Sequence, residues 1–213
     1  MRIILLFILL SSFYSHATPN TLFQSCLNKC STPFGNKLGE NKGVIGYSNC
    51  NPDCESEQWY TIKIGEQPHR SGMKWQCVEY ARRWYMLQLG YTFSSIDHAY
   101  QIWDLVEAEQ LGSAVKKPWN KFSNGLSIEQ PQANDLLIYN KEQGIHGHVS
   151  VIVKVAHGYV YLAEQNYSNT KWESPTYARK ARLIKSPQGH YTIEDLGVIG
   201  WLRLDKKRIL SPK

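Results

Sequence analysis

Short segments with the residue pattern of β-strands follow one another closely in the second half of the chain. They span residues 135–139, 148–155, 159–164, 178–185, 191–193 and 198–204. His157-Gly158 and Ser186–Gly189 lie between neighbouring segments and have the composition and length of hairpin turns. Because strands joined by such short turns run antiparallel, the second half is expected to form an antiparallel meander.

The first half carries helical patterns instead. A helix is predicted to open at Cys77 and to end before Gly90, with a second amphipathic helix over Ser95–Glu109. The polar side of the first helix carries Glu79, Arg82 and Arg83, and its apolar side carries Cys77, Val78, Ala81, Trp84 and Tyr85. Residues 60–64 alternate like a short strand, and breaker residues predict loops over 112–134. Helices followed by an antiparallel meander indicate the α+β class.

The N-terminus resembles a secretory signal peptide. After Met1-Arg2, an apolar run extends from Ile3 to Leu10 and is followed by Ser15-His16-Ala17, a small-x-small cleavage site. The run is much shorter than the ~20 residues of a membrane span, so we expect an exported protein, periplasmic or secreted, and not an integral membrane protein. A retained N-terminal anchor is the alternative.

We expect one globular domain and a monomer. Residues 1–17 form the signal peptide, and 18–57 form a disulfide-tied N-terminal segment that belongs to the same globule. Residues 58–205 form the catalytic core, and 206–213 a basic tail.

The five cysteines divide into two close pairs and a single residue. Cys26 and Cys30 are four residues apart, as are Cys50 and Cys54, whereas Cys77 stands alone. In an exported chain the two pairs predict two disulfides and a free thiol. Of three possible pairings, we favour Cys26 with Cys54 and Cys30 with Cys50. A zinc site is the rival interpretation, although Cys-x3-Cys is not the usual zinc spacing.

The formal net charge is +6, with the surplus in 180–185 and 206–213. Such a surface suits an anionic polymer, but it equally suits a protein that is simply well solvated. Residues 177–183 have the pattern of a solvated strand face, and no nucleic-acid motif surrounds them, so no nucleic-acid partner is expected.

Cys77 is the candidate nucleophile. Unpaired N–H groups and the positive end of the helix macrodipole favour the thiolate at this position. A buried structural cysteine is the alternative.

A thiolate that attacks amides needs a base and a residue that orients the base. His148 begins one predicted strand and Glu164 ends its hairpin partner, so both side chains are expected at the same edge of the sheet. His146 would face the same side and competes for the role of base.

Four motifs in order carry a resemblance to a known family. They are Lys-Trp-Gln-Cys-Val-Glu-Tyr-Ala-Arg-Arg at 74–83, Gly-His-Val at 147–149, Ala-Glu-Gln-Asn at 163–166 and Ile-Gly-Trp at 199–201. The chain resembles the amidase domain of glutathionylspermidine synthetase/amidase, which belongs to the CHAP group of cysteine, histidine-dependent amidohydrolases/peptidases. With Pro33-Phe34-Gly35 and Leu38-Gly39, the resemblance extends from Pro33 to Leu204.

This resemblance implies a papain-like fold and assigns roles to residues. Cys77 would be the nucleophile, His148 the general base and acid, and Glu164 the residue that orients His148. Gln76 would help to hold the oxyanion. No metal or cofactor is implied.

The resemblance also places Arg82 and Asn166 against substrate. For Arg82 the alternative is a salt bridge with Glu79 at i,i+3.

The chain is expected to depart from that family in carrying a signal sequence and extra cysteines, and in lacking the synthetase half, because few residues follow Leu204. The expected substrate is a small peptide-polyamine conjugate or, alternatively, a peptidoglycan stem peptide. A non-catalytic binding module on the same fold is the alternative from a different class, and an intact Cys77, His148 and Glu164 argues against it.

Overall fold

A computed structural model describes residues 21–207, so the predicted signal peptide and residues 208–213 of the basic tail lie outside the described range. Its main sheet contains β5 (Tyr91–Thr92), β6 (Glu107–Gln110), β7 (Lys116–Ser123), β8 (Leu136–Tyr139), β9 (His148–Ala156), β10 (Tyr159–Ala163), β11 (Arg179–Lys185), β12 (Tyr191–Glu194) and β13 (Val198–Leu204). The strand order is β12-β11-β10-β9-β8-β13-β7-β6-β5, and all neighbours are antiparallel. Two separate hairpins, β1 (Lys37–Asn41) with β2 (Val44–Tyr47) and β3 (Trp59–Ile64) with β4 (Gln67–Met73), complete the strands of the described residues.

The α+β class and the predicted strands of the second half are confirmed, but two expectations for the middle of the chain are wrong. The helix expected over Ser95–Glu109 is a short 3-10 helix, η1 (Ala99–Asp104), followed by β6. Val106, which was expected on the apolar face of that helix, is 67% exposed. Beyond η1 the apolar face of a longer helix would therefore not be buried against the rest of the protein. The loop expected over 112–134 contains β7, which lies between β6 and β13 in the sheet.

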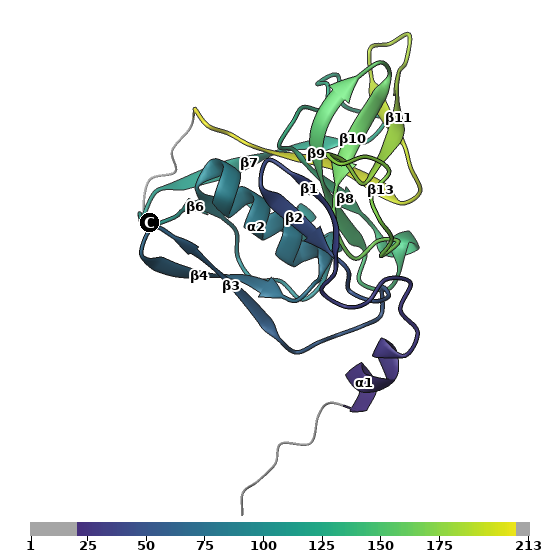
Figure 1. Cartoon of the computed structure of the whole chain (residues 1–213). Helices are drawn as coiled ribbons and strands as arrows, with labels where there is room; N and C mark the ends of the chain where they lie inside the picture. The colour runs from purple at the N-terminus through teal and green to yellow at the C-terminus, as the bar shows by residue number, and fades with distance from the viewer. Residues whose placement is uncertain (1–20, 208–213) are drawn as a thin grey trace, which may run out of the picture.

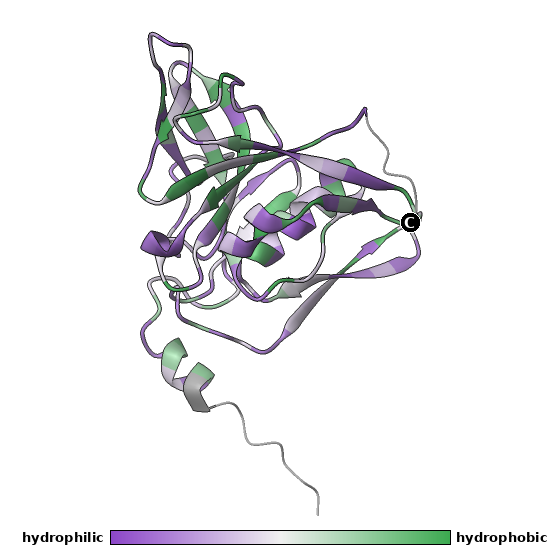
Figure 2. Cartoon of the chain, turned by 180° about the vertical axis from the view of Figure 1, so that it is seen from behind, coloured by the Kyte–Doolittle hydropathy of each residue, from purple (hydrophilic) through white to green (hydrophobic). Residues whose placement is uncertain are grey.

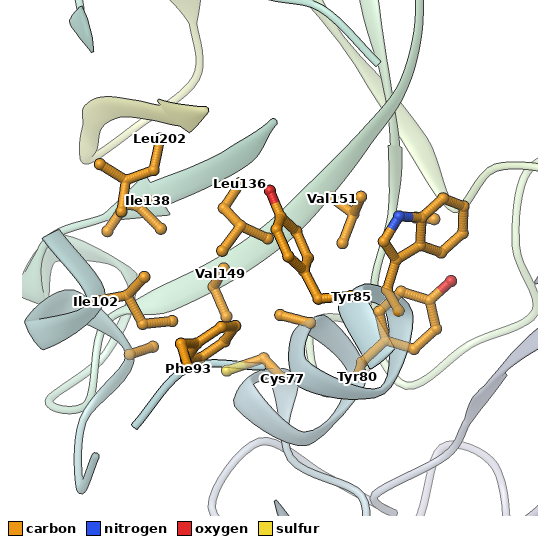
Figure 3. Close-up of a cluster of buried hydrophobic side chains, with 14 of the residues drawn as sticks. Cys77, Tyr80, Tyr85, Phe93, Ile102, Leu136, Ile138, Val149, Val151 and Leu202 are labelled. Atoms are coloured by element: carbon orange, nitrogen blue, oxygen red, sulfur yellow. The ribbon is translucent and has the colours of Figure 1, made fainter. Parts of the chain in front are cut away.

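Helix α2 (Cys77–Leu89) lies at the centre of the molecule, between the main sheet and the two hairpins (Figure 1). Tyr80 and Tyr85 are fully buried in a cluster with Val149 and Val151 of β9 (Figure 3). The helix ends as expected at Gly90, whose left-handed backbone closes the last turn onto the carbonyl of Tyr85. None of the helices within residues 21–207 is long and apolar enough to cross a membrane.

The polar side of α2 is not a solvated face, which corrects the amphipathic interpretation. Glu79 is 0% and Arg83 is 3% exposed, and Figure 2 shows hydrophilic and hydrophobic residues mixed along the helix. Arg83 Nε donates to Glu79 Oε1 at 2.7 Å, and Gln165 Nε2 donates to Glu79 Oε2 at 2.7 Å. Ser71 Oγ and the carbonyl of Ile45 complete the network. Because the charges are paired and hydrogen-bonded, they can be buried, and they tie α2 to both hairpins and to the loop after β10.

Trp172 fills a slot that two glycines leave open in the β1–β2 hairpin. A Cβ at Gly39 would lie 2.3 Å from the Trp172 ring, and a Cβ at Gly46 would lie 2.6 Å from it. The Trp172 indole N–H donates to the carbonyl of Glu164 at 3.2 Å. The two glycines therefore leave space for the Trp172 ring, and the Trp172 indole in turn holds the backbone at Glu164.

The N-terminal segment is pinned by two disulfides, Cys26–Cys54 and Cys30–Cys50. This is the pairing that we favoured, and it leaves no free thiolates in the segment for zinc. Phe23 of α1 (Thr21–Leu27) packs with Cys50 and Cys54 in a small separate cluster.

The buried ion pair in α2 yields a stability prediction. We expect Arg83→Met to lower the free energy of unfolding by about 3–5 kcal/mol, because it leaves the Glu79 carboxylate buried without its counter-charge. Lys37→Met, which breaks the exposed Lys37–Glu40 pair, serves as the control and should cost about 0–1 kcal/mol. Urea unfolding of the three proteins measures the difference, and equal losses in the two variants would contradict this account.

Candidate active site

Cys77 is the first residue of α2 and is the free cysteine within residues 21–207. Its side chain is 7% exposed and lies at the start of the helix beside Phe93 (Figure 3). The N–H groups of a first helical turn have no intrahelical partners, so they can stabilise negative charge on the sulfur or on a substrate oxygen beside it.

The structure brings His148 and Glu164 together at the sheet edge where they were expected. His148 begins β9, Glu164 follows β10, and His148 Nε2 lies 2.8 Å from Glu164 Oε2. His148 is 3% and Glu164 is 2% exposed. The Cys77 side chain also interacts with the imidazole and favours its protonated form, and Nδ1 is the ring nitrogen that Glu164 leaves free. His148 therefore lies between Glu164, to which it is hydrogen-bonded, and Cys77, with which it interacts.

The interactions among Cys77, His148 and Glu164 favour a protonated imidazole and an ionised carboxylate. Burial opposes protonation of His148, but hydrogen bonds with Cys77 and Glu164 outweigh it and raise the pKa of His148 to about 9. Burial favours the neutral acid at Glu164, yet the positive charges of Arg179 and His148 hold its pKa below the usual range. A protonated His148 beside an ionised Glu164 is thus the favoured state near neutral pH.

Arg179 is a member of this site that sequence analysis missed. Its Nε donates to Glu164 Oε1 at 2.6 Å, and its other nitrogens contact Asp195 and the Tyr139 hydroxyl. We expected residues 177–183 to form a solvated strand face, and for Arg179 this is wrong. Its side chain is 14% exposed, because the first residue of β11 turns toward the end of β10. The sequence signal that could have identified Arg179 is its position at the start of a strand predicted to pair with the strand that ends at Glu164.

Gln76 and Asn166 contact each other. Asn166 Nδ2 donates to Gln76 Oε1 at 2.8 Å, and Gln76 Nε2 donates to the carbonyl of Cys54 at 2.7 Å. Gln76 also lines the pocket that contains Cys77, whereas Asn166 does not. The geometry therefore places Asn166 behind Gln76, with its amide engaged by protein groups.

Arg82 does not pair with Glu79, because Glu79 is paired with Arg83. Arg82 lines the same pocket as Cys77, and its Nε is buried with no hydrogen-bond partner within the described residues. Burial lowers the pKa of the Arg82 guanidinium from its ordinary value, but arginine remains charged. Arg82 therefore brings a positive charge to the pocket lining, where it fits an anionic or carbonyl group of a ligand, and its guanidinium carbon lies 5.9 Å from the centre of the Phe93 ring.

His146, the competitor for the role of base, contacts other residues. Its Nδ1 lies 2.8 Å from His98 Nδ1, and its Nε2 lies 3.8 Å from Glu55 Oε1. Both histidines line the pocket, but the hydrogen-bonded partner of Glu164 is His148.

The pocket at Cys77 has a volume of about 340 Å³. Carboxylates of Asp53, Glu55 and Asp97 line it, together with Trp59 and Arg82. Within residues 21–207 no group of three or more His, Cys, Asp or Glu side chains is arranged to hold a metal ion. The arrangement of Cys77, His148 and Glu164 fits nucleophilic attack by the sulfur with proton transfer through His148.

Comparisons with known proteins agree with this chemistry. Residues 68–166, which include Cys77, His148 and Glu164, match the CHAP domain family. The chain is 30% identical over 183 residues to the bifunctional glutathionylspermidine synthetase/amidase of Escherichia coli, covering 80% of this chain and 29% of that protein. It is 34% identical over 125 residues to the trypanothione synthetase of Crithidia fasciculata, covering 58% of this chain and 19% of that protein.

The chain thus spans less than a third of the length of these relatives. Homology to an amidase supports amidohydrolase activity, with a cysteine as the reactive residue. Residues 68–166 of this chain are a CHAP domain, homologous to the amidase domain of glutathionylspermidine synthetase/amidase.

Proposed function

We propose that this protein hydrolyses an amide bond through a thioester on Cys77, with His148 as general acid and base and Glu164 as the orienting residue. The observation that carries the proposal is the buried His148–Glu164 pair, whose imidazole interacts with Cys77 in the lining of a pocket. A non-catalytic binding module would have no need of it. Burying an ionised Glu164 beside His148 costs folding free energy, and such an arrangement is typical of a catalytic site.

The reaction proceeds in two acyl transfers. The Cys77 thiolate attacks the amide carbonyl and forms the carbon–sulfur bond, while the oxygen takes negative charge near the start of α2. His148 gives its proton to the nitrogen as the carbon–nitrogen bond breaks, so the amine leaves neutral. Water then attacks the thioester, His148 accepts its proton, and Cys77 leaves as the thiolate. The remaining N–H of Gln76 is our candidate for a second oxyanion donor.

We propose a conjugate of a small peptide with a polyamine as the substrate. Asp53, Glu55 and Asp97 supply negative charge to the pocket of a chain whose net charge is +6. This local charge favours a cationic leaving amine, and the unpaired Arg82 suits a carboxylate or carbonyl of the peptide part. A peptidoglycan stem peptide is the second candidate, favoured by the basic surface but less by these three acids.

Hydrolysis assays test the substrate. We expect the chain to release spermidine from glutathionylspermidine and Cys77→Ala to release none, because the variant has no nucleophile. Glu55→Gln should raise KM for that substrate by several-fold, yet leave KM unchanged for a glutathione amide of a neutral alkylamine. Release of muropeptides from purified peptidoglycan without release of spermidine would contradict the polyamine substrate, and hydrolysis of neither would contradict the amidase proposal in this form.

The pH dependence tests the role of His148. We expect kcat/KM to fall on the alkaline side near pH 9, because the imidazolium that protonates the leaving amine is lost as pH rises through the pKa of about 9. Glu164→Gln removes a charge that raises this pKa, so its alkaline limb should move to lower pH. Glu194→Gln, which alters an exposed carboxylate paired with Arg182, should leave the limb in place. An unmoved limb in Glu164→Gln would contradict the assignment.

We also propose that the protein is exported, to the periplasm or beyond. The two disulfides support an oxidising compartment, and the pattern of residues 1–17 supports a cleaved signal. Protein recovered from expressing cells should begin near Thr18 and should be alkylated at Cys26, Cys30, Cys50 and Cys54 only after reduction. A chain that retains Met1 and has four reactive thiols would contradict export.

A further inference from the structure

We propose that Arg179 is a positioning residue of the hydrolytic site, which fixes Glu164 so that a single carboxylate oxygen faces His148. The inference rests on the proposed roles of Cys77, His148 and Glu164. Arg179 touches neither the thiol nor the pocket at Cys77, so its effect must pass through Glu164.

The two oxygens of Glu164 have different partners. Oε1 accepts from Arg179 Nε at 2.6 Å, and Oε2 contacts His148 Nε2 at 2.8 Å. Rotation of the carboxylate would break both contacts. Arg179 therefore decides which oxygen His148 meets and in what orientation.

Arg179 is itself held by groups from other parts of the sheet. Its Nη2 donates to the Tyr139 hydroxyl at 2.8 Å, and its Nη1 donates to Asp195 Oδ2. The Tyr139 hydroxyl in turn donates to Asp195 Oδ2 at 2.9 Å. Tyr139 ends β8 directly opposite His148 in the β8–β9 pair. The guanidinium thus links the end of β8 and the segment after β12 to the orienting carboxylate.

Aromatic rings enclose the same group. The ring of Tyr167 lies 4.1 Å from the Arg179 guanidinium carbon and 5.2 Å from the His148 ring. The Tyr139 ring lies 5.4 Å from the His148 ring. This packing limits water around Glu164 and strengthens the charge interactions there.

The charges explain why an arginine is needed. The Arg179 guanidinium contacts the carboxylates of both Glu164 and Asp195, so it offsets negative charge on the side of Glu164 away from His148. Without the guanidinium, Glu164 and Asp195 would both lose the cation that they contact. Glu164 would then take up a proton at higher pH, and His148 would lose its acceptor.

Substitution of Arg179 tests the proposal. In Arg179→Gln we expect kcat to fall about 100-fold with KM within about two-fold of wild type, because the loss is in orientation and not in substrate contact. The rate of Cys77 alkylation by iodoacetamide falls as the pH is lowered. In Arg179→Gln this acid limb should lie about one pH unit higher, because Glu164 protonates more readily. Free guanidinium should restore part of kcat in Arg179→Gly.

The control is Arg203→Gln, which breaks another pair of a largely buried arginine with a buried carboxylate. Arg203 is 19% exposed and contacts Asp135 at 2.8 Å, away from Cys77. It should lower thermal stability to a similar degree without moving the alkylation limb. Equal kinetic losses in both variants, or a loss in Arg179→Gln with an unmoved acid limb and no rescue, would overturn the proposal and leave Arg179 a structural residue.

A milder variant guards against failure of Arg179→Gln to fold. Asp195→Asn keeps the guanidinium but weakens its second anchor, so it should lower kcat about ten-fold with KM unchanged. Wild-type kcat in this variant would overturn the proposed network. Failure of the amidase proposal itself is distinguishable, because wild type would then hydrolyse none of the amides tested and would show no alkylation limb to shift.

Discussion

The site depends on three consecutive side chains that follow β10. Glu164 contacts His148 and Arg179, Gln165 contacts Glu79, and Asn166 contacts Gln76. One tripeptide therefore holds the imidazole on one side and the start of α2 on the other. Because Cys77 begins that helix, the same backbone segment sets the position of the sulfur relative to the imidazole.

The site is built around buried charge, and the molecule compensates that charge at each point. Glu79 is matched by Arg83, Glu164 by Arg179 and His148, and Asp135 by Arg203. Each unmatched member would be costly, so these pairs fix the register of α2 and of the strands. Arg82 is the contrasting case, since its buried Nε has no partner in the described residues and lies in the pocket lining. A positive charge without a carboxylate partner, in the lining of the pocket that contains Cys77, is suited to a ligand.

Sequence patterns predicted the elements that follow strict periodicity. The strands around His148 and Glu164 and the helix opening at Cys77 could be placed because alternation, turn residues and the stop at Gly90 agree. The proximity of His148 and Glu164 followed from the hairpin alone. The disulfide pairing followed from spacing only as a preference among three.

The failures have physical causes. Glu79 and Arg83, considered singly, have the side chains of solvent-exposed residues. Their burial is possible because Arg83 and Gln165 both donate hydrogen bonds to the Glu79 carboxylate. Arg179 has the pattern of an exposed strand residue, and its partners Asp195 and Tyr139 are distant in sequence. The helix expected over 95–109 was replaced by η1 and β6 because β6 pairs with β5 and β7, a tertiary contact that local pattern does not encode.

The most direct test of the account is the thiolate absorbance of Cys77, measured near 240 nm between pH 5 and pH 10 as the difference between wild type and Cys77→Ala. We predict that the signal is already present at neutral pH and that His148→Ala removes it there, because the imidazolium stabilises the thiolate. A signal that appears only above about pH 8.5, as for an unperturbed thiol, and that is the same with and without His148, would contradict the central claim that these two residues form the reactive ion pair.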